Sequence, residues 1–200
     1  MISEGVVVSA YSSGELVALQ AESGRLLWGD TLGSAVKTRA SSIFGGIACD
    51  PIVQDGVVVV ISTNGALQAS ALANGRPLWQ AEIGGHDTPW SAGNTLFVLS
   101  DTHDVAALLK RDGRIRWANS LAVKDKRDTT RDITPALYGP ILAGNAVLVL
   151  DAKGVLTTFK PEDGTVLGTY DLAPGAAAAP IVANGALYVI TRDAQLYRYR

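Results

Sequence analysis

Few residues of this chain have the types and spacing that catalysis or metal binding requires. The two histidines, His86 and His103, lie outside any HExxH pattern or other paired ligand spacing, so they do not predict a zinc site. The single cysteine, Cys49, allows neither an intramolecular disulfide nor a CxxC motif within these residues. No serine lies in a GxSxG elbow, so the sequence does not predict acyl transfer.

One short segment places two carboxylates and an imidazole together. The run Asp101-Thr102-His103-Asp104 could hold a cation or orient a water molecule. The alternative is that the aspartate side chains cap their own backbone in a tight turn. No glycine-rich loop runs from a strand into a helix, as phosphate binding requires. The sequence therefore predicts no catalytic residue, no metal site and no cofactor.

Composition indicates a folded chain built from short strands. Hydrophobic residues make up 48% of the 200 residues and charged residues 18%, with 21 glycines and 8 prolines. A chain of this length buries about 70% of its unfolded surface, which excludes a disordered tail. The net charge of -2 and the lack of a polybasic stripe argue against a nucleic-acid partner. The apolar runs are far shorter than the ~20 residues of a transmembrane helix, and the N-terminus lacks the pattern of a signal peptide.

An internal repeat organises the chain. Alanine, glycine and tryptophan recur with spacings of six and then four residues, as Ala18, Gly24 and Trp28, then Ala69, Gly75 and Trp79, then Ala107, Gly113 and Trp117. A fourth copy keeps Gly164 but has Thr158 and Gly168 at the other two positions. Prolines open a strand in each unit at intervals of about 40 residues, at Pro51, Pro89, Pro140 and Pro180.

Within a unit, alternation and turn residues predict four antiparallel strands. Residues 57–61 are predicted as a buried strand, Asn64-Gly65 as a two-residue hairpin turn and residues 66–72 as the partner strand. A further turn leads into residues 76–80, and the short strand after Pro51 completes the unit.

Four strands in about 40 residues, repeated, are typical of a β-propeller blade. The sequence therefore predicts an all-β fold, a β-propeller of four-stranded antiparallel blades, with about four and a half blades in this chain. We expect one propeller segment over 1–200, with units at approximately 1–48 (partial), 49–86, 87–137, 138–177 and 178–200 (partial). Each recurring tryptophan is predicted to wedge between adjacent blades, across the alanine and glycine positions of a neighbour.

Two insertions between units are the best candidates for function, because loops on one rim of a repeat scaffold usually carry it. The first, residues 31–50, contains basic residues and an apolar trio, Ile43, Phe44 and Ile47, that favours partner binding. The alternative is that Phe44 and Ile47 close the blade junction. The second insertion, residues 118–139, has nearly balanced charges and predicts either a solvated loop or a polar docking rim.

The repeated Ala, Gly and Trp positions resemble the tryptophan-docking motif of the pyrroloquinoline quinone (PQQ) repeat propellers along the whole chain. Residues 43–53, 84–93 and 138–144 resemble segments of the BamB family of outer-membrane protein assembly factors, in its alphaproteobacterial form. The resemblance implies an eight-bladed propeller without a cofactor or enzymatic activity. It implies a lipoprotein on the periplasmic face of the outer membrane, bound there only through a lipid anchor. It further implies a scaffold that binds the periplasmic domains of BamA and other Bam subunits and assists delivery of unfolded outer-membrane proteins.

The resemblance also implies that this chain corresponds to the C-terminal half of a family member, without the lipidated cysteine. One part of the family's BamA-binding surface would then precede Met1. Another part, a pair of acidic residues, falls on Gly46 and Ala48 here. We expect other residues of the same loop to serve instead, and the predicted partner-binding set is Arg39, Ile43, Phe44, Ile47 and Asp50.

Two other kinds of propeller remain open from the sequence. PQQ-dependent dehydrogenases share the docking motif but add calcium-binding carboxylates, a vicinal disulfide and often a haem. One cysteine excludes the vicinal disulfide and a CxxCH haem site within these residues. A sensor or carbohydrate-binding propeller is the other alternative. In each case a half ring would expose apolar faces and unpaired strand edges, which predicts association or a need for further blades.

Overall fold

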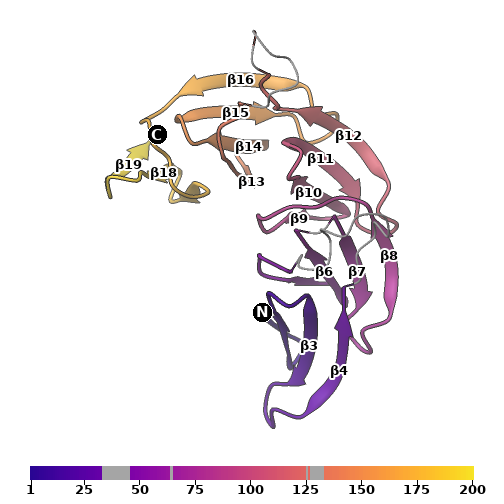
Figure 1. The fold of residues 1–200 in the computed structure, drawn as a ribbon. Helices are drawn as coiled ribbons and strands as arrows, with labels where there is room; N and C mark the ends of the chain where they lie inside the picture. The colour runs from indigo at the N-terminus through magenta and orange to yellow at the C-terminus, as the bar shows by residue number, and fades with distance from the viewer. Residues whose placement is uncertain (33–45, 64, 125, 127–132) are drawn as a thin grey trace.

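The fold is an arc of antiparallel sheets. The computed structural model describes residues 1–32, 46–63, 65–124, 126 and 133–200. These residues form five sheets that fan out around a common centre, with the N- and C-terminal sheets at the two ends of the arc (Figure 1). The described residues contain strands and turns but no helix, so none of them forms a helix able to cross a membrane. The predicted all-β fold with four-stranded antiparallel blades is confirmed.

Four sheets have four strands each and the fifth has three. The first contains β1 (Ile2–Ser3), β2 (Val6–Ala10), β3 (Glu15–Gln20) and β4 (Leu26–Thr31). The second contains β5 (Ile52–Gln54), β6 (Val57–Ile61), β7 (Leu67–Ala71) and β8 (Pro77–Ala81). The third contains β9 (Trp90–Ala92), β10 (Thr95–Leu99), β11 (Asp104–Leu109) and β12 (Ile115–Ser120). The fourth contains β13 (Leu137–Ala143), β14 (Ala146–Asp151), β15 (Val155–Phe159) and β16 (Val166–Asp171). The fifth contains β17 (Ile181–Ala183), β18 (Ala186–Ile190) and β19 (Leu196–Tyr199).

The strand order follows from local turn chemistry. Asp55 and Gly56 both have left-handed backbone angles, with φ of 52° and 70°, and together form the two-residue turn between β5 and β6. Such turns match the right-handed twist of a hairpin. The predicted two-residue turn at Asn64-Gly65 is wrong, because the β6–β7 pairing begins at Ile61 and Leu67 and leaves a longer connection. That connection is closed by the Ser62 amide, which donates to the Ala66 carbonyl at 2.8 Å.

Proline positions agree with strand starts except in the fourth sheet. Pro51, Pro89 and Pro180 directly precede β5, β9 and β17. Pro140 instead lies inside β13, where the pairing with β14 shifts register between Tyr138 and Ile141. Proline cannot donate a ladder hydrogen bond, and the register shift removes the need for one. The expectation that Pro140 opens the strand is therefore corrected.

The hydrophobic core is divided into four clusters, one between each pair of neighbouring sheets. Between the first two sheets, for example, Val8 and Leu16 pack with Val58 and Val60, and all four are buried. Each inner sheet thus buries both of its faces against neighbours, as blades of a propeller do. The first sheet also has four strands, where the sequence predicts a partial unit; its β1 is only two residues long.

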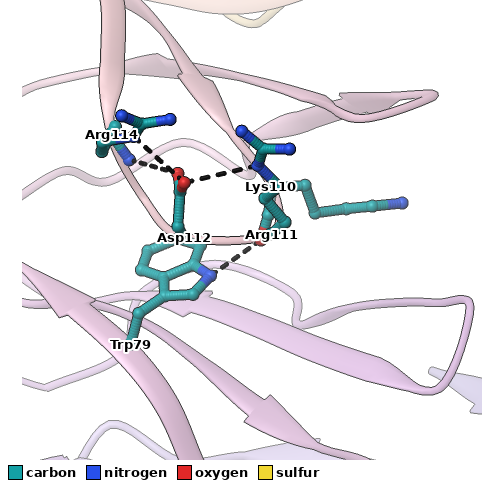
Figure 2. Close-up of polar contacts among 5 residues, drawn as sticks. All are labelled: Trp79, Lys110, Arg111, Asp112 and Arg114. Carbon is teal, nitrogen blue, oxygen red and sulfur yellow. Dashed lines mark hydrogen bonds and ion pairs between the residues drawn. The ribbon is translucent and has the colours of Figure 1, made fainter.

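Three tryptophans hold the sheets together in the same way. Trp79, on the outer strand β8, donates its indole N–H to the Lys110 carbonyl of the next sheet at 2.7 Å (Figure 2). A Cβ placed on Gly113 would lie 2.6 Å from Cε3 of that indole. The glycine therefore serves two needs, a left-handed φ of 72° and the close approach of the ring. Equivalent contacts join Trp28 with Leu72 and Gly75, and Trp117 with Pro161 and Gly164.

The turn that receives Trp79 is held by charged groups. The Asp112 carboxylate accepts from Nε of Arg114 at 3.0 Å and of Arg111 at 3.4 Å (Figure 2). Lys110 extends from the same turn, and its Nζ lies 2.7 Å from the Asp55 carboxylate of the second sheet. The Lys110–Asp55 ion pair therefore joins this turn to the second sheet.

The repeated alanines differ from the prediction in one respect. Ala18 lies directly opposite Trp28 in the same sheet, and not in the neighbouring one. The pairs Ala69–Trp79 and Ala107–Trp117 have the same register, and each is followed by a β-bulge. The small side chain opposite the indole leaves room for the ring within its own blade. In the fourth sheet the corresponding pair is Thr158 and Gly168, so no tryptophan reaches the fifth sheet from this position.

Candidate functional site

One face of the arc carries the segments that connect successive sheets, and we call it the connection face. Its described segments are residues 46–51, 82–89, 121–124, 133–136 and 172–180. Backbone hydrogen bonds seat these segments on the turns between the second and third strands of the sheets. The Thr63 amide donates to the Gly46 carbonyl at 3.0 Å, and the Asp101 amide to the Gly84 carbonyl at 2.9 Å. The described ends of both insertions lie on this face, and the tryptophan-docking turns lie at the opposite ends of the strands.

Ile47 closes the junction between the first two sheets. It is 5% exposed and belongs to the same buried cluster as Leu32 and Val58. Its amide donates to the Tyr11 carbonyl at 3.4 Å. This corrects the placement of Ile47 among the partner-binding residues in favour of the alternative, closure of the junction. The remaining apolar and basic members of that set, Arg39, Ile43 and Phe44, lie outside the described residues.

The loop before β5 leaves little room for an acidic pair. A Cβ on Gly46 would overlap the backbone of Ser12, so no side chain fits there without a backbone shift. Asp50, in contrast, is exposed, and its amide donates to the Thr88 hydroxyl at 3.2 Å. Burial raises the pKa of the Cys49 thiol, which keeps it in the less reactive protonated form. Of the predicted partner-binding set, only Asp50 is both described and accessible.

Two adjoining cavities on the connection face form one hollow, which we call the rim groove. The first cavity measures about 390 Å³ and is lined by His86, Asp87, Leu99, Ser100, Asp101, His103, Ala136, Leu137 and Tyr138. The second measures about 400 Å³ and is lined by Ala10, Ile47, Ala48, Cys49, Asp50, His86, Asp87 and Thr88. They meet at His86 and Asp87, which belong to both. The rim groove therefore combines residues from four sheets or their connections.

Two glycines bring the segment before β9 close to the third sheet. A Cβ on Gly84 would lie 2.5 Å from Oδ2 of Asp101, and one on Gly85 would lie 2.6 Å from the Leu99 carbonyl oxygen. Larger residues at either position would push the segment away. The pair therefore places Asp87, two residues after Gly85, on the same concave surface as Asp101.

Asp87 is a carboxylate of the rim groove with a strongly shifted pKa. Burial raises its pKa from 3.8 to about 6, although a hydrogen bond from the Gly139 backbone and the charge of His86 act in the opposite direction. Perturbed carboxylates in a hollow are candidates for functional sites. At neutral pH the group is mostly ionised, so a half-buried negative charge faces the groove.

The turn from Ser100 to Asp104 matches neither prediction made for it completely. The Ser100 hydroxyl, and not an aspartate, caps the Asp104 amide at 3.0 Å, and the Thr102 hydroxyl donates to the Asp104 carboxylate at 2.8 Å. The Asp101 carboxylate makes no hydrogen bond or ion pair in the described part of the chain. Within that part, no three His, Cys, Asp or Glu side chains gather in a group that could hold a metal ion.

The sequence did not predict that these residues line one groove. Asp101 was interpreted only within its own turn, and no role was predicted for Asp87 or Tyr138. The available signal was the Gly84-Gly85 pair, which indicates a close backbone approach just before the titratable residues His86 and Asp87. The contribution of Tyr138, from a different sheet, has no local signal.

Comparison with known proteins gives one consistent group. Residues 1–119 and 125–200 match the family described as "Outer membrane protein assembly factor BamB". The protein of that name from Legionella pneumophila (strain Paris) is 28% identical over 199 residues, which are 98% of this chain and 48% of the relative. The chain thus spans about half the length of the curated relatives it matches.

Solved structures show the same fold. The crystal structure of BamB from Moraxella catarrhalis superposes with a TM-score of 0.82 at 20% identity, over 100% of this chain and 57% of that one. A quinohemoprotein alcohol dehydrogenase, ADHIIG from Pseudomonas putida HK5, superposes with a TM-score of 0.61 at 16% identity, over 88% of this chain and 34% of that one. At these identities the likeness concerns the fold alone.

Proposed function

Because the chain belongs to the family of the outer membrane protein assembly factor BamB, we propose that it serves as a non-enzymatic scaffold of the outer-membrane β-barrel assembly machinery. The observation that carries the proposal is the extent of the family match, which covers strands of all five sheets and not the docking motif alone. The names of the relatives support a location in the periplasm, at the outer membrane.

We propose further that the connection face binds the periplasmic domains of BamA. Loops on one rim of a rigid repeat scaffold can vary without disturbing the core, which makes that rim suited to recognition. Asp50 is exposed there, and the predicted Arg39, Ile43 and Phe44 belong to the same loop. Contacts with other Bam subunits, assistance to unfolded outer-membrane proteins and the alphaproteobacterial assignment remain predictions.

A dehydrogenase role is the weaker alternative. The quinohemoprotein neighbour is similar in fold only, at 16% identity. No group of carboxylates able to hold a metal ion occurs among the residues that the structure describes. We therefore retain this alternative only as an outcome of the experiment below.

The test is a binding titration of the protein with purified periplasmic domains of BamA, in parallel with a PQQ and calcium titration followed by absorbance. We expect saturable BamA binding, weakened at least about tenfold, or 1.4 kcal/mol, by combined Arg39→Ala, Phe44→Ala and Asp50→Lys substitutions. Glu22→Lys is the control, because Glu22 is exposed in a docking turn at the other ends of the strands. PQQ uptake without BamA binding would favour the dehydrogenase alternative.

A further inference from the structure

The rim groove concentrates negative charge from three separate segments. Asp50 lies just before β5, Asp87 just before β9, and Asp101 in the turn between β10 and β11. None of the described residues that line the groove is lysine or arginine. Carboxylates on a concave surface focus the electrostatic field, because the low-dielectric walls screen them less than water does. The groove is therefore electrostatically complementary to a cation.

Neither Asp87 nor Asp101 forms an ion pair with a lysine or arginine among the described residues. Asp101 makes no ion pair there, and Asp87 receives only the Gly139 backbone hydrogen bond and the nearby imidazole of His86. Asp87 is half-buried, whereas Asp101 is exposed. The half-buried carboxylate gains more from an arriving cation, because water has already been partly removed from it. The charge of the groove is thus available for binding a ligand.

The walls of the first cavity suit a long side chain with a charged end. Leu99, Leu137 and the ring of Tyr138 provide apolar contact beside the carboxylates. Arginine has an aliphatic stem that packs on apolar surface and a planar guanidinium that pairs with carboxylates and stacks on aromatic rings. A small metal ion fits less well, since no metal-holding group occurs among the described residues.

We propose that the rim groove binds a short basic segment of a partner protein, with an arginine side chain seated between Asp87 and Asp101 and against Tyr138. This inference does not depend on the identity of the partner, and it holds or fails separately from BamA binding. It assigns a recognition role to the segment 84–88, and it gives the turn 100–103 a side-chain ligand in place of the cation or water molecule considered from the sequence.

The test is a titration of the full chain with the peptide acetyl-Gly-Arg-Gly-amide, followed by two-dimensional NMR. We expect amide shifts confined to residues 84–88, 100–103 and 136–139. The citrulline version of the peptide has the same shape without the charge, and we expect it to bind at least about fivefold more weakly. Rising salt concentration should weaken binding of the arginine peptide and leave binding of the citrulline peptide unchanged.

Matched variants locate the site. The double variant Asp87→Asn, Asp101→Asn should bind the arginine peptide at least about fivefold more weakly. The control double variant Glu22→Gln, Glu162→Gln removes the same net charge from exposed docking turns and should bind the peptide as the original protein does. Unbound spectra of each variant verify that the fold is retained.

Three results would overturn the inference: equal affinity for both peptides, shifts centred outside the groove, or equal weakening by both variant pairs. Displacement of the peptide by one equivalent of calcium would also overturn it, in favour of a metal site. Peptide binding without BamA binding would leave the groove intact and reject the proposed function. The reverse result would reject the groove alone.

Discussion

Single glycines in this protein are fixed by side chains from a neighbouring sheet. Gly113 has a left-handed φ of 72°, and the indole of Trp79 occupies the position of its missing Cβ. Gly24 occupies the same place in its own docking turn with a φ of 67°, yet no atom lies within 4 Å of its Cβ position. The two glycines therefore separate the effect of backbone conformation from that of packing.

We expect Gly113→Ala to destabilise the protein by about 3 kcal/mol and Gly24→Ala by about 1 kcal/mol, because only the first combines backbone strain with overpacking. Urea unfolding of the 200-residue chain, followed by tryptophan fluorescence, measures both changes. Equal losses for the two variants would show that backbone strain alone explains the conserved spacing seen within this chain.

A second prediction concerns the charge of Asp87. Its folded-state pKa of about 6 exceeds the ordinary value of 3.8, so the folded state binds the proton more tightly than the unfolded state. Stability should then fall as pH rises from 3.8 to about 6, and the loss should persist at higher pH. Asp87→Asn should remove this loss and raise the free energy of unfolding at pH 7.5 by about 1 kcal/mol, after allowance for solvent screening.

The measurement is the free energy of unfolding at several pH values between 4 and 8, for the original protein and the variant. The two curves should meet near pH 4 and separate towards pH 7. Parallel curves over this range would mean that Asp87 does not cause the pH dependence.

At the scale of elements, the connecting segments position the rim groove because backbone contacts seat them on the sheets. Gly85 contributes through close approach alone, since its φ is not in the left-handed region. Its absent side chain allows the segment 82–89 to lie against the Leu99 carbonyl and the Ile61 side chain. The position of this segment in the groove therefore depends on the small size of Gly85 as well as that of Gly84.

Gly85→Ala should destabilise the protein by about 2 kcal/mol and weaken binding of the arginine peptide, because the added methyl group displaces the segment. Gly29→Ala is the matched control, since its Cβ would lie 3.9 Å from the nearest atom, the Leu16 carbonyl oxygen, and should change stability by less than about 0.5 kcal/mol. Denaturant unfolding and the NMR titration measure the two effects. A stable Gly85→Ala variant with unchanged peptide affinity would contradict this account.

The elements themselves were largely predictable because their signals are local. Alternation and turn residues indicate the four-stranded blades, and the spacing of Gly75 and Trp79 indicates the docking motif. The length of the β6–β7 connection and the position of Pro140 within β13 were not predictable, since pairing between strands decides them. The rim groove was missed because Asp87 and Tyr138 meet only through the arrangement of different sheets.

At the scale of the whole molecule, the sheets at the two ends of the arc expose apolar surface of the kind that inner sheets bury against their neighbours. Ile181 and Leu196 of the fifth sheet are 66% and 69% exposed. The chain spans 48% of its Legionella relative. We therefore propose that further blades complete a ring of eight, docking one of their tryptophans on Gly24.

The isolated 200-residue chain should consequently self-associate as its concentration rises, because exposed apolar faces and strand edges favour pairing. Sedimentation velocity over a concentration series measures this. A single monomeric species at every concentration would show that the end sheets are stable without neighbours.

The central claim, that the connection face is where this propeller meets BamA, is tested most directly by hydrogen–deuterium exchange of the protein with and without the BamA periplasmic domains. The account predicts that BamA slows exchange at residues 46–51, 82–89 and 100–104, with no change at the docking turns 72–75 and 110–114. Protection confined to the docking turns, or no protection at saturating BamA, would contradict it.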